Sequence, residues 1–348
     1  MTLVRLISPS SFNMMRFKAK KRPTRHQSKN PPKATSNRAG MVQIDLGSID
    51  EEQVEDIKVV ARVRPLTRRE KDPNFLRKAS AGERAWKIIP EHQSVMQLQR
   101  NQTTVAKEDR RQNRSLFTFD KVFGEDSETE EVYDCVAKEL VESAVDGRNG
   151  SIFAYGQTGS GKTHTMQGVG GSIRDVGMGL EGKKMTKGII QMVAEDLFNL
   201  IEQVEDRDYV LQVSVIEVYN EEVRDLLSKK DDARLMIRED PGSGVFVGAV
   251  RREANSLNKL LAILSGGERN RVVARTALNR KSSRSHIIFS INIESFPVEE
   301  TGGTSRSNSY IQRSNLNLID LAGSESVRHR SAHSTEKRRK EGGSINKR

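Results

Sequence analysis

Residues 156–163 read Gly-Gln-Thr-Gly-Ser-Gly-Lys-Thr and follow the pattern G-x-x-x-x-G-K-[ST] of a phosphate-binding loop. The preceding residues 151–155 are mostly apolar and predict a short buried strand, so the loop would connect a strand to a helix. Glycines at this spacing let the backbone wrap a phosphate, with several N–H groups pointing inward. Lys162 brings a positive charge to the outer phosphates, and the hydroxyl of Thr163 suits Mg²⁺. The stretch predicts a nucleotide site, and the preceding strand disfavours the alternative of a glycine-rich turn that binds nothing.

The overall composition predicts a soluble globular protein. The chain has 348 residues, of which 35% are hydrophobic and 30% are charged. No run approaches the roughly 18 apolar residues that a membrane span needs, so we expect no membrane partner. The single cysteine, Cys135, excludes an internal disulfide framework.

The net charge of +11 originates at the N-terminal end. Residues 1–40 hold ten of the 58 Lys and Arg residues and no Asp or Glu, whereas the other 48 basic residues nearly balance the 47 acidic ones. We therefore expect no specific nucleic-acid partner. We predict a disordered basic extension over residues 1–50 and a folded domain over residues 51–348. The extension leaves three interpretations open: a nuclear or organelle targeting signal, an arm for an acidic surface, or a plain solvated tail.

Strands and helices alternate along the folded part of the chain. We expect strands at 57–63, 117–119, 151–155, 209–219, 286–295 and 313–321, strand pairs within 86–98 and 235–247, and helices at 129–145, 189–201, 220–227 and 257–264. The last of these helices would close at Gly266-Gly267. The alternation predicts an α/β fold of the P-loop NTPase type, with a central, mostly parallel sheet and helices on both faces.

Two further stretches carry groups that nucleotide hydrolysis needs. Residues 279–286, Asn-Arg-Lys-Ser-Ser-Arg-Ser-His, offer hydroxyls and a guanidinium directly before a predicted strand. Residues 320–325, Asp-Leu-Ala-Gly-Ser-Glu, offer a carboxylate at a strand end, a glycine N–H and a second carboxylate. Such groups can sense a terminal phosphate, hold Mg²⁺ and position a water molecule.

This set of stretches resembles the kinesin motor domain. The matching segments are the phosphate loop with residues 164–166, a switch I at 279–286, a switch II at 320–325, the element Arg-Val-Arg-Pro at 62–65, and Val-Tyr-Asn-Glu at 218–221. They occur in the order of the family between about residues 57 and 347. The resemblance implies a domain that binds and hydrolyses ATP, with Mg²⁺, and that binds microtubules.

The resemblance assigns roles residue by residue. For nucleotide binding it implies Arg62, Arg64, Pro65, Gly156, Gln157, Thr158, Gly159, Ser160, Gly161, Lys162, Thr163 and His164. For catalysis it implies Ser282, Ser283, Arg284, Asp320, Gly323 and Glu325. For Mg²⁺ it implies Thr163, Ser283 and, through a water molecule, Asp320.

Some of these implied roles are specific. Arg64, Pro65 and His164 would contact the adenine, whereas Arg62 has a surface charge at a strand end as its alternative. Ser282 would help to order the attacking water, and the Gly323 N–H would sense the γ-phosphate. Arg284 and Glu325 would form an ion pair that closes the pocket, with a plain surface pair as the alternative.

The resemblance also implies a partner and a location. Residues 328–340 hold six Lys and Arg residues and one acid, Glu336, where the family contacts tubulin. Basic clusters of this kind bind acidic surfaces in a salt-sensitive way, so we expect a cytoskeletal, microtubule-bound protein in the cytoplasm. The amino-acid sequence of residues 338–347 slightly favours the subgroup resembling centromere-associated kinesins.

The sequence departs from the family at its C-terminal end, where Arg348 follows Ile345-Asn346-Lys347. The family continues with further helices and a strand that lies beside the strand of residues 151–155. We therefore expect a truncated motor domain with an unpaired place in its sheet, which would fold poorly. The alternative to an ATP-hydrolysing motor domain is accordingly a truncated ATP- or microtubule-binding fragment without motor activity.

Overall fold

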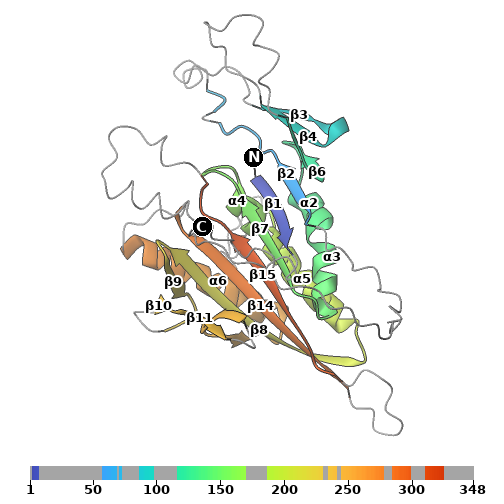
Figure 1. The fold of residues 1–348 in the computed structure, drawn as a ribbon, viewed down its shortest axis with the longest axis vertical. Coiled ribbons are helices and arrows are strands. Elements are labelled where there is room, and N and C mark those ends of the chain that lie inside the picture. Colours follow the sequence, from blue (N-terminus) through green and yellow to red (C-terminus); the bar gives the residue numbers. More distant parts are fainter. Residues whose placement is uncertain are drawn as a thin grey trace, which may run out of the picture.

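A large β-sheet forms the centre of the molecule (Figure 1). The computed structural model describes residues 2–7, 57–68, 70–72, 86–97, 116–169, 186–229, 234–240, 244–277, 284–298 and 310–324. Across the sheet, the described strands follow in the order β10 (Arg234–Leu235), β9 (Glu222–Asp225), β8 (Arg207–Tyr219), β14 (His286–Pro297), β15 (Gln312–Asp320), β7 (Gly150–Tyr155), β1 (Thr2–Ile7), β2 (Val59–Arg62) and β6 (Lys121–Phe123). A further strand, β13 (Arg252–Glu253), pairs with β8.

The sheet is mixed, so the prediction of a mostly parallel sheet is wrong for its described strands. Neighbouring strands are parallel at β15–β7 and β2–β6, and the other described pairs in this sheet are antiparallel. The strands β14 and β15 follow one another in the chain, and an antiparallel hairpin needs no crossover helix between its strands. Apolar alternation in the sequence gives the faces of a strand but not its direction, which explains the error.

Helices cover one face of the sheet in the described part of the chain (Figure 1). They are α2 (Thr129–Val136), α3 (Lys138–Val145), α4 (Lys162–Gln167), α5 (Ile189–Glu202) and α6 (Leu257–Ala277). These helices form one connected layer, because α5 packs against each of the other four. The expected helices on the opposite face are not found among the described residues.

The hydrophobic core lies between the sheet and this helical layer. On β14, Ile287, Phe289, Ile291 and Ile293 are buried, and they alternate with residues on the opposite face. That opposite face is polar at several positions; for example, the hydroxyl of Ser290 donates a hydrogen bond to Asn317 Oδ1 at 2.7 Å. One apolar and one polar face is the pattern expected of an antiparallel sheet with a single buried side.

The N-terminal strand β1 lies inside the sheet, between β7 and β2 (Figure 1). It is antiparallel to both, with Val4 opposite Val60 on one side and Ala154 on the other. The prediction of disorder over residues 1–50 is therefore wrong for Thr2–Ile7, while residues 8–50 lie outside the described part. The expected unpaired place beside β7 is also corrected, because β1 fills it.

Two predicted helices differ from the structure. The helix expected over 129–145 is divided into α2 and α3, which meet at Ala137. The helix expected to end at Gly266-Gly267 continues through both glycines as α6. A Cβ on Gly267 would lie only 2.8 Å from Val215 Cγ1 on β8, so this glycine permits close helix–strand packing and does not end the helix.

The helical turn predicted at 220–227 is instead a tight turn followed by the strand β9. Asn220 and Glu221 have φ values of 50° and 67°, in the left-handed region. Two successive residues with positive φ are typical of the two-residue turns that join antiparallel strands. The turn therefore folds β9 back onto β8, with Tyr219 opposite Glu222.

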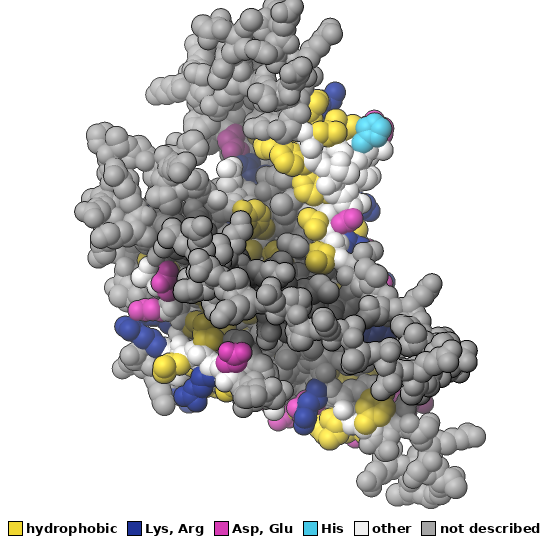
Figure 2. All heavy atoms as spheres, in the orientation of Figure 1, with side chains coloured by type: hydrophobic (Ala, Val, Ile, Leu, Met, Phe, Trp, Pro, Cys, Tyr) yellow, Lys and Arg dark blue, Asp and Glu magenta, His cyan; other side chains and the backbone are white. Residues whose placement is uncertain are grey.

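Two small sheets confirm the predicted strand pairs. The first consists of β3 (Trp86–Ile89), β4 (Ser94–Gln97) and β5 (Leu116–Thr118), with the short 3₁₀ helix η2 (Pro90–His92) between β3 and β4. The second consists of β11 (Ile237–Asp240) and β12 (Gly244–Val247). Figure 2 shows hydrophobic side chains gathered over the first small sheet, where Leu116 and Phe117 are exposed.

No helix in the described ranges has the length and apolarity to cross a membrane.

Candidate nucleotide-binding site

The glycine-rich loop lies where the sequence predicted it, between β7 and α4. The loop comprises residues 156–161, and α4 begins at Lys162. Gly159 and Gly161 have φ values of 80° and 106°, which residues with a Cβ rarely adopt, so the path of the loop depends on glycine there. Along the loop, Gln157, Thr158 and Gly159 are exposed, whereas Gly156 and Ser160 are buried.

Lys162 places its charge inside the curve of this loop. Its side chain is buried, and Nζ donates hydrogen bonds to the carbonyl oxygens of Gly156 at 2.8 Å and Gln157 at 3.0 Å. A buried ammonium held by neutral carbonyls is a strong donor for an anion in the same place. The arrangement is therefore suited to a phosphate group.

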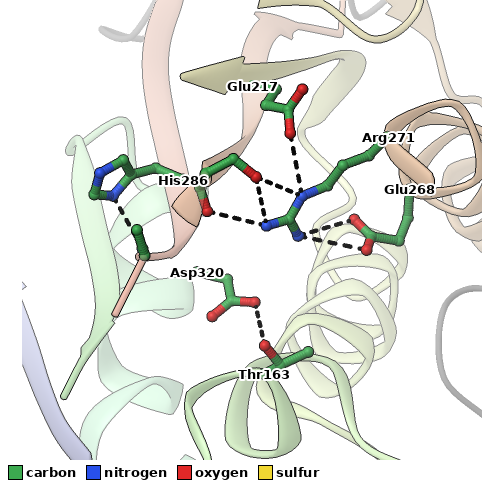
Figure 3. A network of polar contacts seen from close by, with 8 residues as sticks. Thr163, Glu217, Glu268, Arg271, His286 and Asp320 are labelled. Carbon is green, nitrogen blue, oxygen red and sulfur yellow. Dashed lines mark hydrogen bonds and ion pairs between the residues drawn. The ribbon is translucent and has the colours of Figure 1, made fainter. Parts of the chain in front are cut away.

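Thr163 and Asp320 join the loop to the end of β15. The Thr163 hydroxyl donates a hydrogen bond to Asp320 Oδ2 at 2.7 Å (Figure 3). Asp320 is 2% exposed, and its Oδ1 has no hydrogen-bond partner in the described part of the chain. Burial raises the pKa of the Asp320 carboxyl, although the positive charge of Arg271 acts in the opposite direction. A buried carboxylate with an unpaired oxygen is an unusual feature that a cation or its water could satisfy.

A buried ionic cluster around Arg271 of α6 lies close to Asp320 (Figure 3). The guanidinium approaches Glu217 of β8 at 3.7 Å and Glu268 of its own helix at 3.4 Å. It also donates to the backbone carbonyl of Ser285 at 3.1 Å. All three ionic side chains are at most 3% exposed, so their attraction is little screened by water. The cluster thereby fixes the position of Ser285, which lies between Arg284 and the start of β14.

Two hydrogen bonds donated by backbone N–H groups connect the two predicted switch stretches to each other and to the loop. The N–H of Ala322 donates to Nδ1 of His286 at 3.1 Å, which ties the residues after β15 to the start of β14. The N–H of Ser324 donates to the carbonyl of Gly156 at 3.1 Å. Gly323 is buried between these two contacts, next to the glycine-rich loop.

Arg64 follows β2 and reaches the other side of the loop. Its Nε donates to the carbonyl of Gly159 at 2.7 Å, and Nη1 donates to the carbonyl of Pro65 at 2.9 Å. Glu70 accepts two further hydrogen bonds from this guanidinium, at 2.7 and 2.8 Å. The structure thus brings Arg64 to the glycine-rich loop, and Pro65 follows it in the chain.

Arg62 has protein partners that differ from both sequence expectations. Its guanidinium donates to Thr165 Oγ1 of α4 at 3.0 Å, to Thr129 Oγ1 of α2 at 3.1 Å and to the Ser127 carbonyl at 2.9 Å. It therefore bridges the two helices α2 and α4. Partial burial and the charge of Arg62 lower the pKa of His164, which favours a neutral imidazole at this edge of the loop.

Part of the predicted site lies outside the described residues. These positions are Ser282, Ser283 and Glu325, together with the basic stretch 328–340. Arg284 is described and is partly buried at the start of the segment that leads into β14.

The sequence interpretation missed four charged side chains that contact residues of the site or lie near them. Glu70, Glu217, Glu268 and Arg271 were not singled out. The spacing of Glu268 and Arg271, three residues apart, would have indicated an ion pair on a helix. That signal was hidden because the predicted helix ended before these residues.

The comparison with known proteins agrees with this geometry. Residues 62–348 match the family described as "Kinesin motor domain". The chain belongs to the kinesin family. The resemblance inferred from the sequence is thus confirmed at the level of the family, whose motor domains bind ATP and microtubules.

The kinesin relatives include proteins from three different organisms. The chain is 39% identical over 295 residues to "Kinesin-like protein KIN-7D, chloroplastic" of Oryza sativa subsp. japonica, which covers 84% of this chain and 25% of that protein. It is 42% identical over 234 residues to "Kinesin-related protein 11" of Dictyostelium discoideum, and the match covers 66% of this chain and 32% of that protein. It is 39% identical over 297 residues to "Kinesin-like protein KIF15" of Mus musculus, and the match covers 84% of this chain and 19% of that protein. The chain thus spans a third or less of each of these three relatives.

A solved kinesin structure confirms the fold. The structure of a fast kinesin is 31% identical to this chain and superposes with a TM-score of 0.63. The match covers 80% of this chain and 69% of that one. The α/β motor fold with a P-loop is therefore shown, with the corrections to strand direction and helix placement given above.

Proposed function

We propose that this kinesin chain binds ATP in the loop of residues 156–163, hydrolyses it, and binds microtubules. The observation that carries the proposal is the meeting of the glycine-rich loop and the stretch of residues 320–325 at one point. Thr163 hydrogen-bonds Asp320 at 2.7 Å, and Ser324 hydrogen-bonds Gly156 at 3.1 Å. A loop that holds phosphates and a segment that senses them need this contact to respond to one another.

The phosphate end of the site uses the chain's own charges. Lys162 would exchange its carbonyl partners for phosphate oxygens, and the loop N–H groups would surround the same phosphates. The Gly323 N–H would donate to the γ-phosphate, and Arg284 with Glu325 would close the pocket and stabilise developing charge. Ser282 would hold the attacking water.

The donor set fits Mg²⁺. Thr163 offers a hydroxyl and Asp320 a buried carboxylate with one unpaired oxygen among the described residues. Such a set of few protein ligands is typical of Mg²⁺ sites that also use substrate phosphates. We propose that Thr163 and Ser283 bind the ion directly and that Asp320 acts through a water molecule. Mg²⁺ would neutralise charge on the phosphates during transfer.

The adenine end is proposed to consist of Arg64, Pro65 and His164. Arg64 follows β2 and hydrogen-bonds Gly159 of the loop, whereas His164 lies in the first turn of α4, directly after the loop. A planar guanidinium and a neutral imidazole both stack well on an aromatic base. We assign Arg62 to the support of α2 and α4, on the strength of its three hydrogen bonds.

Microtubule binding is proposed to use the basic residues 328–340, on the sequence evidence. A cytoskeletal location follows from this partner. The relatives named KIN-7 support a place near the kinesin-7 proteins, and the finer centromere-associated assignment rests on residues 338–347 alone. A presequence cleaved within the first 25 residues would remove β1 from the sheet, which argues against import into an organelle.

The test of this function is the steady-state ATPase rate with and without microtubules. We expect microtubules to raise the rate at least about tenfold, and added salt to weaken that stimulation because exposed charges are screened. A measurable rate that microtubules do not change would reject the motor proposal and favour the fragment without motor activity. A chain that does not hydrolyse ATP under either condition would reject the enzymatic proposal as well.

A second test replaces Asp320 by Asn. Asp320 and the buried charged side chains near it comprise three carboxylates, Asp320, Glu217 and Glu268, against the two cations Lys162 and Arg271. Removing the excess negative charge should stabilise the protein without nucleotide by about 1 kcal/mol, because an ionised carboxylate is costly to bury. The same change should weaken Mg²⁺-dependent ATP binding about tenfold, because a neutral amide binds the ion's water less strongly.

Thermal melting and ATP titrations, each with Mg²⁺ and with EDTA, would measure both effects of Asp320→Asn. In EDTA the variant and the wild type should bind ATP alike. If the variant keeps the full Mg²⁺ dependence of the wild type, Asp320 has no role toward the ion.

A further inference from the structure

Glu70 lies beside the proposed adenine contact but has no assigned role. Its two carboxylate oxygens accept hydrogen bonds from the two terminal nitrogens of Arg64, at 2.7 and 2.8 Å. A planar, two-point pairing of this kind sets the orientation of a guanidinium as well as its position. Both side chains are partly exposed, so the pair borders on solvent at the open side of the loop.

Glu70 is itself held in place by the turn before it. The N–H and the hydroxyl of Thr67 donate to Glu70 Oε2 at 2.8 and 2.9 Å. The hydroxyl of Thr67 also accepts from the Glu70 N–H at 3.3 Å. Arg64, followed by these Thr67 contacts, lowers the pKa of the Glu70 carboxyl to about 2, so the carboxylate stays ionised at any working pH.

The contacts of Arg64 leave a particular surface of the side chain for a ligand. Nε binds the Gly159 carbonyl, Nη1 binds the Pro65 carbonyl and Glu70, and Nη2 binds Glu70. Guanidinium N–H bonds lie in the plane of the group, so these partners surround its edge and not its flat faces. A flat cation fixed at its edge can offer a face to an aromatic base.

The geometry points to Glu70 as a positioning residue that orients the Arg64 guanidinium for stacking on the nucleotide base. This inference rests on the proposed function, since it assumes that Arg64 contacts adenine. Without Glu70, Arg64 keeps its bonds to the carbonyls of Gly159 and Pro65 but loses the two-point pairing that helps to fix the rotation of its plane. The base should then be held less well, while the phosphates should be held as before.

The test compares a ligand that has a base with one that lacks it. We expect Glu70→Gln to weaken ATP binding about fivefold, the scale of one exposed charged pair, and to change tripolyphosphate binding by less than about twofold. The melting temperature should change by about 2 °C or less, because the pair is partly exposed. The matched control is Glu294→Gln, which removes another partly exposed pair, with Arg313 at 3.0 Å, far from the loop in the sequence. It should alter neither affinity.

A double-mutant cycle tests whether Glu70 acts through Arg64. In an Arg64→Ala background, Glu70→Gln should cause no further loss of ATP affinity. An additional loss in that background, an equal loss for both ligands, or no loss at all would each overturn the inference. A wild type that binds ATP no better than tripolyphosphate would reject the base contact and this inference together, yet leave the phosphate site intact. A wild type that binds neither ligand would reject the proposed function itself.

Discussion

Lys162→Ala is expected to weaken ATP binding by at least about 100-fold. The ammonium is buried in the glycine-rich loop and is held by two carbonyl oxygens at 2.8 and 3.0 Å. Phosphate oxygens would replace those partners, and a hydrogen bond between charged groups contributes about 1.5–3 kcal/mol. Two such bonds lost together correspond to a change of about 100-fold or more in the dissociation constant.

A titration with ATP at constant Mg²⁺ measures this loss, and melting curves separate it from unfolding. Without nucleotide, the variant should still unfold cooperatively but melt below the wild type, because the buried carbonyl of Gly156 loses its hydrogen-bond partner and the buried carboxylates nearby lose one of their two cations. The rise in melting temperature that ATP gives the wild type should disappear. Lys187→Ala is the matched control, since Lys187 is exposed and pairs with Glu195 at 2.7 Å. An unchanged ATP affinity in Lys162→Ala would contradict the phosphate role of the loop.

The part of this site that the sequence predicted is the part encoded by short stretches. Residues 151–163 contain a strand, a glycine-dependent turn and a helix start, and each depends on neighbours within a few positions. The strands β14 and β15 were predicted for the same reason, from alternation of apolar residues. The fold class and the family followed from these local signals and their order.

The errors arose where distant residues determine the local structure. The helix α6 continues through Gly267, because the absence of a side chain there lets Val215, 52 positions earlier, pack closely against the helix backbone. Arg271 supports the site only because α6 packs against β8 and brings it to Glu217. None of these contacts is visible in a window of sequence.

Val4→Pro is expected to destabilise the protein by about 3 kcal/mol or more. The strand β1 pairs with neighbours on both sides, and Val4 is opposite both Val60 and Ala154. Proline has no N–H to donate and does not fit the interior of a sheet. For a domain of this size, the loss corresponds to a fall in melting temperature of roughly 6–12 °C. Val4→Ile is the matched control, because it keeps the backbone N–H and a β-branched side chain, and it should melt closer to the wild type than Val4→Pro.

The same variant tests whether β1 supports the nucleotide site. The strand β7 carries the glycine-rich loop at its C-terminal end, and Ala154, two residues before Gly156, pairs with β1 on one side and Asp320 of β15 on the other. Loosening β1 would leave β7 held by β15 alone, so Val4→Pro should also weaken ATP binding at temperatures where the protein is still folded. Deletion of residues 2–7 should have the larger effect, because it leaves the edges of β7 and β2 unpaired next to the buried Ile152 and Val60. If Val4→Pro melts within about 2 °C of the wild type and binds ATP equally well, β1 is not a structural strand of this sheet. The resemblance to other kinesins predicted a gap at this place, and only the N-terminal residues of this chain fill it in the described structure.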